Sequence, residues 1–86
     1  MRRLEEALST CSRITEMFPE NPVGFYNLAG AHALMGNFDK AIAALTRDLE
    51  LGDTDWEYLS ADPWFKSLRD DPRFSAIVMA MKGKSG

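Results

Sequence analysis

A spacing of 34 residues between two similar segments is the feature that most constrains how this chain can fold. Each segment has a small side chain, then a larger apolar one, then a residue suited to a turn. These residues are Ala7, Cys11 and Pro19 in the first segment, and Ala41, Leu45 and Asp53 in the second. Similarity at a fixed period of about 20 to 50 residues is typical of repeat proteins, whose units stack on their neighbours. The spacing therefore predicts a helical repeat.

Apolar side chains recur with the period of an α-helix in three stretches before Gly52. In residues 3 to 18 they are Leu4, Leu8, Cys11, Ile14 and Met17. In residues 22 to 35 they are Phe25, Leu28, Ala29, His32 and Met35. The stretch after residue 37 has Phe38, Ala41, Ile42, Leu45 and Leu49. This periodicity predicts three amphipathic helices, each with one face turned toward its neighbours.

The ends of these helices are marked by residues that suit helix termini. Asn21 can accept a hydrogen bond from an unpaired helical N–H, and Pro22 fits the first turn, where no donor is needed. Gly36 and Gly52 can adopt the left-handed conformation that ends a helix. The turn after Gly36 is short, so the helices on its two sides are expected to run antiparallel.

The large and small positions of residues 22 to 55 resemble the tetratricopeptide repeat. The resemblance implies an all-α fold of antiparallel helical repeats, an α-α superhelix, in one domain over residues 1–86. Ala29 and Ala41 occupy the small positions of the family, where helix axes about 8 to 10 Å apart leave no room for a larger side chain. The parts implied are the second helix of a partial repeat over 3–20, a complete repeat over 22–53 and a degenerate capping segment over 54–82.

The repeat register fails after Gly52, where the small position of Ala29 maps onto Pro63. Asp-Pro pairs at 62–63 and 71–72 instead predict short helices that begin at the prolines. The second of these helices is expected to bury Phe74, Ile77, Val78 and Met81. This region is similar to the terminal segment that closes many bacterial arrays of this family. Its expected role is to cover the apolar face of the last full repeat.

Composition argues against several classes of function. A hydrophobic fraction of 45%, a charged fraction of 27% and a net charge of -3 are ordinary for a globular domain and give no reason to expect a nucleic-acid partner. No apolar run approaches the roughly 20 residues that span a bilayer. One cysteine and no secretory signal favour a reducing, cytoplasmic setting. The chain opens within a repeat, as a fragment of a longer array would.

In this family the first helix of each repeat lines a concave surface, and the resemblance assigns partner binding to that face of residues 22 to 35. The residues assigned are Val23, Tyr26, Asn27, Gly30, Ala33 and Leu34. Asn27 is the leading candidate, because an amide can both donate to and accept from the backbone of an extended peptide. The alternative is that Asn27 is only a solvated helix residue. Members that clamp a carboxylate have cations here, and none lies between Arg13 and Lys40.

Neither catalysis nor metal binding is expected. Cys11 and His32 could be imagined as a nucleophile and its base, yet nothing else in the sequence looks like an oxyanion site. The acidic run of Asp53, Asp55 and Glu57 lacks the glycine and the glutamate that a calcium loop requires. We therefore assign no catalytic residue, no metal ligand and no cofactor. The expected function is a binding module for a peptide or a partner protein.

Charge is unevenly distributed in the second half of the chain. Six acids and two cations lie between residues 53 and 72, and this acidic shoulder is a candidate docking surface. The acids are Asp53, Asp55, Glu57, Asp62, Asp70 and Asp71, and the cations are Lys66 and Arg69. Asp48 stands where the family has a small apolar residue that packs on the next repeat. With no regular repeat following, we expect Asp48 to be exposed or paired with a cation such as Arg69.

The helix of residues 3 to 18 lacks the antiparallel partner that the repeat scheme would give it. The stripe left without that cover consists of Leu4, Leu8, Cys11 and Ile14. Open apolar patches of about a few hundred Å² tend to mark interfaces, and the commonest symmetric assembly that buries such a patch is a two-fold dimer. The alternative function is thus a structural or self-association element, either the closing piece of an array or a homodimer. A competing possibility is that the helix of residues 72 to 82 folds back over this stripe.

Overall fold

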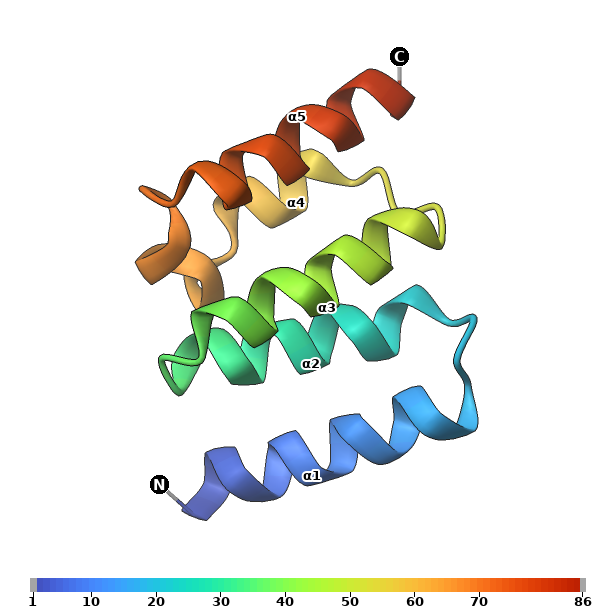
Figure 1. Ribbon diagram of the computed structural model, residues 1–86, viewed down its shortest axis with the longest axis vertical. Helices are drawn as coiled ribbons and strands as arrows, with labels where there is room; N and C mark the ends of the chain where they lie inside the picture. The colour runs from blue at the N-terminus through green and yellow to red at the C-terminus, as the bar shows by residue number, and fades with distance from the viewer. Residues whose placement is uncertain (1, 86) are drawn as a thin grey trace.

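Six helical segments follow one another along residues 2–85, the part of the chain that the computed structural model describes. They are α1 (Arg2–Met17), α2 (Pro22–Leu34), α3 (Phe38–Glu50), α4 (Trp56–Ala61), the 3-10 helix η1 (Pro63–Leu68) and α5 (Pro72–Ser85). No strand occurs among these residues. Figure 1 shows the long helices stacked side by side, with α1 at one end and α5 at the other. The predicted all-α repeat fold is confirmed.

Polar side chains cap the starts of α2, η1 and α5. The side chain of Asn21 accepts a hydrogen bond of 3.0 Å from the backbone N–H of Val23, at the start of α2. Asp62 accepts one of 2.9 Å from the N–H of Trp64 and so caps η1. Asp71 caps α5 in the same way. Both helix starts predicted from Asp-Pro pairs are confirmed, the first as a 3-10 helix.

Two glycines end the paired helices α2 and α3. Gly36 has a φ of 81° and Gly52 one of 105°, in the left-handed region where a side chain would be strained. After α2 the N–H of Gly36 donates to the carbonyl of Ala33, and the N–H of Asn37 donates to that of His32 at 2.8 Å. This pair of bonds is a Schellman motif, and it recurs after α3. Both predicted glycine stops are confirmed.

Small residues allow the first three helices to pack closely. Ala29 of α2 and Ala41 of α3 have no exposed surface, in agreement with their assignment to the small positions of the repeat. On the other side of α2, Gly24 faces α1. A Cβ on Gly24 would lie 3.1 Å from the side chain of Ile14, so the glycine lets α1 approach. The three helices thus form one continuous layer, α1 on α2 on α3.

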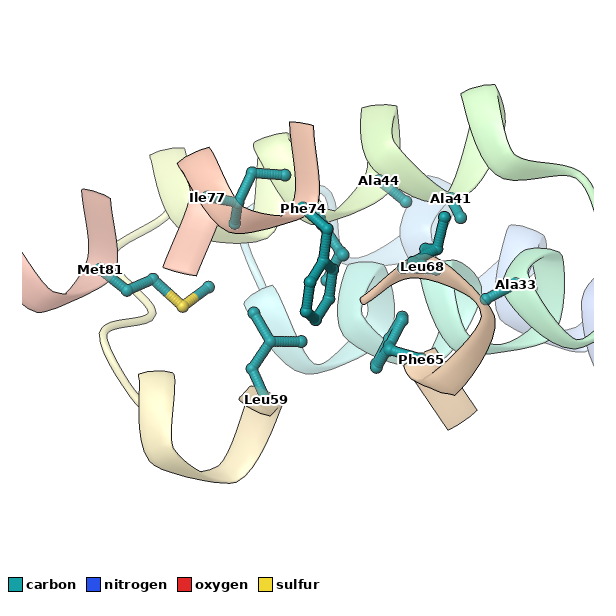
Figure 2. Packing of buried hydrophobic residues seen from close by; sticks show 11 residues of the cluster. Ala33, Ala41, Ala44, Leu59, Phe65, Leu68, Phe74, Ile77 and Met81 are labelled. Carbon is teal, nitrogen blue, oxygen red and sulfur yellow. The ribbon is translucent and has the colours of Figure 1, made fainter. Parts of the chain in front are cut away.

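The segment after Gly52 closes the other side of the α2–α3 pair. Figure 2 shows side chains of α4, η1 and α5 pointing toward those of α2 and α3 in one apolar cluster. Phe65 of η1 is fully buried and stacks on Phe74 of α5, with 5.9 Å between ring centroids. Helix α5 packs against α3 and α4, at the far end from α1 (Figure 1). The alternative in which this helix folds back onto the stripe of α1 is therefore wrong.

Candidate functional site

A hollow of about 410 Å³ lies between the first half of α2, the end of α3 and the segment that leads into α4 and η1. Three of the six residues assigned to partner binding line it, namely Val23, Tyr26 and Asn27. Val23 is 62% exposed at the rim, and Tyr26 and Asn27 are half-buried. The helical spacing of these residues places them on one side of α2, where the hollow opens.

The capping segment covers the next part of the same helix. Trp64 of η1 lies directly on Gly30, and a Cβ at Gly30 would overlap the indole ring. Ala33 is also buried, at 3% exposure. Leu34 is exposed and lines a separate depression that shares only Trp64 with the hollow. Contrary to the expectation that they face a partner, Gly30 lies under Trp64 of η1 and Ala33 belongs to the buried apolar cluster.

Tyr26 is fixed in place by contacts with the cap. Its hydroxyl donates a hydrogen bond to Asp62 Oδ2. Its ring meets Phe65 edge-on, with centroids 5.4 Å apart, and lies 5.8 Å from the ring of Tyr58. Burial raises the pKa of Tyr26, and the hydrogen bond to Asp62 raises it further. Tyr26 is therefore a neutral phenol that forms a firm aromatic wall of the hollow.

Asp48 lies in the wall of the hollow at the end of α3 and has no exposed surface. Within residues 2–85 neither of its carboxyl oxygens accepts a hydrogen bond from a donor group. Burial raises the pKa of Asp48 to about 8, and the carboxyl group of neighbouring Asp53, close enough to share a proton with it, raises the pKa further. The prediction that Asp48 is exposed or paired with Arg69 is wrong. The reason is the turn after α3, in which the N–H of Asp53 donates to the backbone carbonyl of Asp48 and brings the chain back over it.

The open side of the hollow is acidic. Asp53 and Asp55 line it together with Asp48, and no lysine or arginine among the described residues does so. Asp55 accepts a hydrogen bond of 3.2 Å from the N–H of Tyr58 and so caps α4, while Asp53 accepts one from the N–H of Asp55. These bonds hold two carboxylates of the acidic shoulder at the hollow. Capping accounts for the orientation of Asp53 and Asp55, but it does not account for Asp48.

Cys11 and His32 do not interact as a nucleophile and a base would. No hydrogen bond joins them in the described chain, and burial raises the pKa of the Cys11 thiol, whereas an activated thiol has a lowered one. His32 is buried, with its Nδ1 3.4 Å from Nδ2 of Asn37. Burial and nearby Lys40 lower the pKa of His32. Residues 2–85 hold no group of three or more His, Cys, Asp or Glu side chains placed to bind a metal ion.

The apolar stripe of α1 is partly covered by α2. Its four residues, Leu4, Leu8, Cys11 and Ile14, are all half-buried. Figure 1 shows α1 at the edge of the stack, with a neighbouring helix on one side only. Two large apolar side chains at the end of α1, Met17 and Phe18, are 68% and 55% exposed.

Comparison with models of protein families matches residues 1–61 to the tetratricopeptide repeat. The match covers more than half of the 86 residues, and the chain belongs to the tetratricopeptide repeat family. This repeat is a scaffold for protein–protein interaction and is in general non-catalytic. Comparison with curated proteins found no significant match, and comparison with solved structures found none either.

No helix within residues 2–85 is both long enough and apolar enough to cross a bilayer.

Proposed function

We propose that this chain is a non-catalytic module that binds an extended segment of a partner protein in the hollow beside α2. The supporting observation is that Val23, Tyr26 and Asn27 remain open in a hollow of about 410 Å³, although the cap covers Gly30 and Ala33 on the same helix. The cap thus confines binding to the first half of α2.

Asn27 is the residue best suited to hold a peptide backbone. Its side chain takes part in no hydrogen bond within residues 2–85, so both its donor and its acceptor are free for a ligand. Val23 offers an exposed apolar contact at the rim, and Tyr26 is held rigidly by Asp62 and Phe65. A preformed wall reduces the ordering cost of binding. Because the Asn27 amide would hydrogen-bond to the peptide main chain, its contacts would select little for the peptide sequence.

Selection from a displayed library of random short peptides tests this function. We expect selected peptides to bind Asn27→Ala about tenfold more weakly than the parent, because up to two hydrogen bonds of about 1 kcal/mol each are lost. The thermal midpoint of Asn27→Ala should hardly change, since substitutions at the protein surface usually alter stability by no more than about 0.5 kcal/mol. Ser75→Ala, at an exposed position of α5 outside the hollow, is the matched control. Failure to select any peptide, or equal binding by Asn27→Ala, would contradict the proposal.

A second candidate function is self-association through α1. It is favoured by the place of α1 at the edge of the stack (Figure 1) and by the exposure of Met17 and Phe18. Size exclusion with light scattering measures it directly. A dimer that Leu8→Glu abolishes supports a homodimer, and a monomer at every micromolar concentration rejects it. We further propose a reducing, cytoplasmic setting, on the basis of the single cysteine.

A further inference from the structure

We infer that the hollow takes an arginine side chain of the bound segment, with Asp48 as the buried counter-charge. The inference rests on the proposed binding function, since it names the side chain that the hollow selects from the partner.

The position of Asp48 is the first observation. The residue is fully buried, it lies in the wall of the hollow, and neither carboxyl oxygen accepts a hydrogen bond from a donor group of the described chain, the nearby carboxyl of Asp53 being a second acid. A buried carboxyl without a hydrogen-bond partner is costly, and an apolar residue would fill this position without that cost. A guanidinium entering the hollow supplies the missing donors and the opposite charge.

The surrounding charge is the second observation. The titratable groups that line the hollow with Asp48 are the phenol of Tyr26 from α2, the carboxylates of Asp53 and Asp55 from the turn, and the phenol of Tyr58 from α4. None of them is a cation, and the lining drawn from residues 2–85 holds no lysine or arginine at all. The charge of the hollow is therefore complementary to a positive ligand, and no cation of the described residues balances it there.

The aromatic walls favour arginine over lysine. Tyr26 and Tyr58 both line the hollow, and their ring centroids lie 5.8 Å apart at an interplanar angle of 58°. A planar guanidinium stacks on aromatic rings and is less strongly hydrated than an ammonium, so it loses less hydration energy on entering a partly apolar site. Tyr58 is 63% exposed and has room to shift as a side chain enters.

Proton release on binding follows from the burial of Asp48. Its pKa of about 8 means that the carboxyl of the free protein is largely protonated at neutral pH. A bound guanidinium favours the ionised form and lowers that pKa. Affinity for a cation should therefore rise as the pH increases toward about 8 and then level off, because the proton no longer has to be displaced.

Titration with n-butylguanidinium, followed through the amide chemical shifts of the protein, tests the inference. At constant ionic strength we expect saturable shifts at Tyr26, Asn27 and Tyr58, with n-butylammonium weaker and the neutral n-butylurea without effect. Asp48→Asn should weaken n-butylguanidinium binding about tenfold or more and remove its pH dependence. Asp70→Asn removes the same charge from an exposed site outside the hollow and should leave the affinity nearly unchanged.

Three results would overturn the inference: no saturable shift, equal affinity in Asp48→Asn, or equal binding of n-butylurea. The unperturbed remainder of the spectrum verifies that the variant is folded. Selected peptides that require Asn27 but lack arginine would also contradict the inference, while leaving the proposed function standing. Conversely, Asp48-dependent binding of n-butylguanidinium without any selectable peptide would contradict the proposed function and leave the cation site standing.

Discussion

Replacement of Asp48 by asparagine is expected to stabilise the protein at neutral pH. The two side chains have nearly the same size and shape, so the packing at the end of α3 is retained. The change removes the ability to ionise and replaces one carboxyl oxygen by an amide nitrogen, which can donate to the carboxylate of neighbouring Asp53. Because Asp48 is fully buried and no cation of residues 2–85 lines the hollow beside it, the native state disfavours its charged form, whereas the unfolded chain does not.

The magnitude follows from the two pKa values. The carboxyl ionises at about 3.8 in the unfolded chain and at about 8 in the native protein. Between these values the native state holds the proton that the unfolded state has lost, so each pH unit removes about 1.4 kcal/mol from the free energy of unfolding. From 3.8 to 7 the loss amounts to about 4 kcal/mol. This is an upper bound, since the native chain can relax to admit water, and we expect Asp48→Asn to be more stable by about 2 to 4 kcal/mol at neutral pH.

The sign of the effect fixes its pH window. A native pKa above the unfolded one gives stability that is complete below about pH 4 and lost as the pH rises toward about 8. The parent and Asp48→Asn should therefore be about equally stable near pH 4 and diverge steadily above it. Groups distant from Asp48 titrate equally in both proteins, so the difference between the two unfolding free energies reports on Asp48 and the groups coupled to it.

Urea unfolding followed by far-ultraviolet circular dichroism, at a series of pH values, measures this difference. A stability difference of about 2 to 4 kcal/mol is large beside the total stability of about 5 to 15 kcal/mol typical of a domain, so urea unfolding can measure it. Asp70→Asn, at an exposed position, serves as the charge control and should follow the parent. A difference between the parent and Asp48→Asn that does not grow with pH, or a variant less stable at about pH 8, would refute the burial argument.

Three further predictions concern packing and metal ions. Gly30→Ala should destabilise the protein by about 1 to 3 kcal/mol in thermal denaturation, because the new methyl group overlaps the ring of Trp64. The overlap should outweigh the higher helix propensity of alanine. A stabilised variant would show that Trp64 does not pack on this helix. Ala41→Phe should likewise lose about 1 to 3 kcal/mol at the fully buried crossing of α2 and α3, and a melting temperature equal to that of the parent would contradict the close packing. Calcium or zinc should leave the thermal midpoint unchanged, since a ligand of the native state alone must raise it, and a clear rise would reveal a metal site.

The boundaries of the helices could be predicted from the sequence because they depend on residues within about one turn of each other. Asn21 caps α2 through the N–H two residues on, and Gly36 and Gly52 end their helices through their own backbone conformation. The small position of Ala41 was equally predictable, since Ala7 lies 34 residues before it, and that of Ala29 followed from the resemblance to the repeat family.

The candidate site was only half predictable from the sequence. Helical spacing placed Val23, Tyr26 and Asn27 on one side of α2, as observed. The same spacing extended that surface to Gly30, which Trp64 covers from 34 positions further along the chain. A glycine in the middle of a helix was the available signal of a close approach.

Tertiary structure alone decided where Asp48 lies and what the hollow contains. Asp48 is buried because the chain turns back over the end of α3, and the apolar periodicity within α3 does not indicate that turn. The bond from Tyr26 to Asp62 joins residues 36 positions apart, and the hollow gathers side chains from α2, α3, α4 and η1. Local patterns fix helices because their hydrogen bonds are local, whereas burial and the pKa of a carboxyl depend on whichever distant segments pack around it.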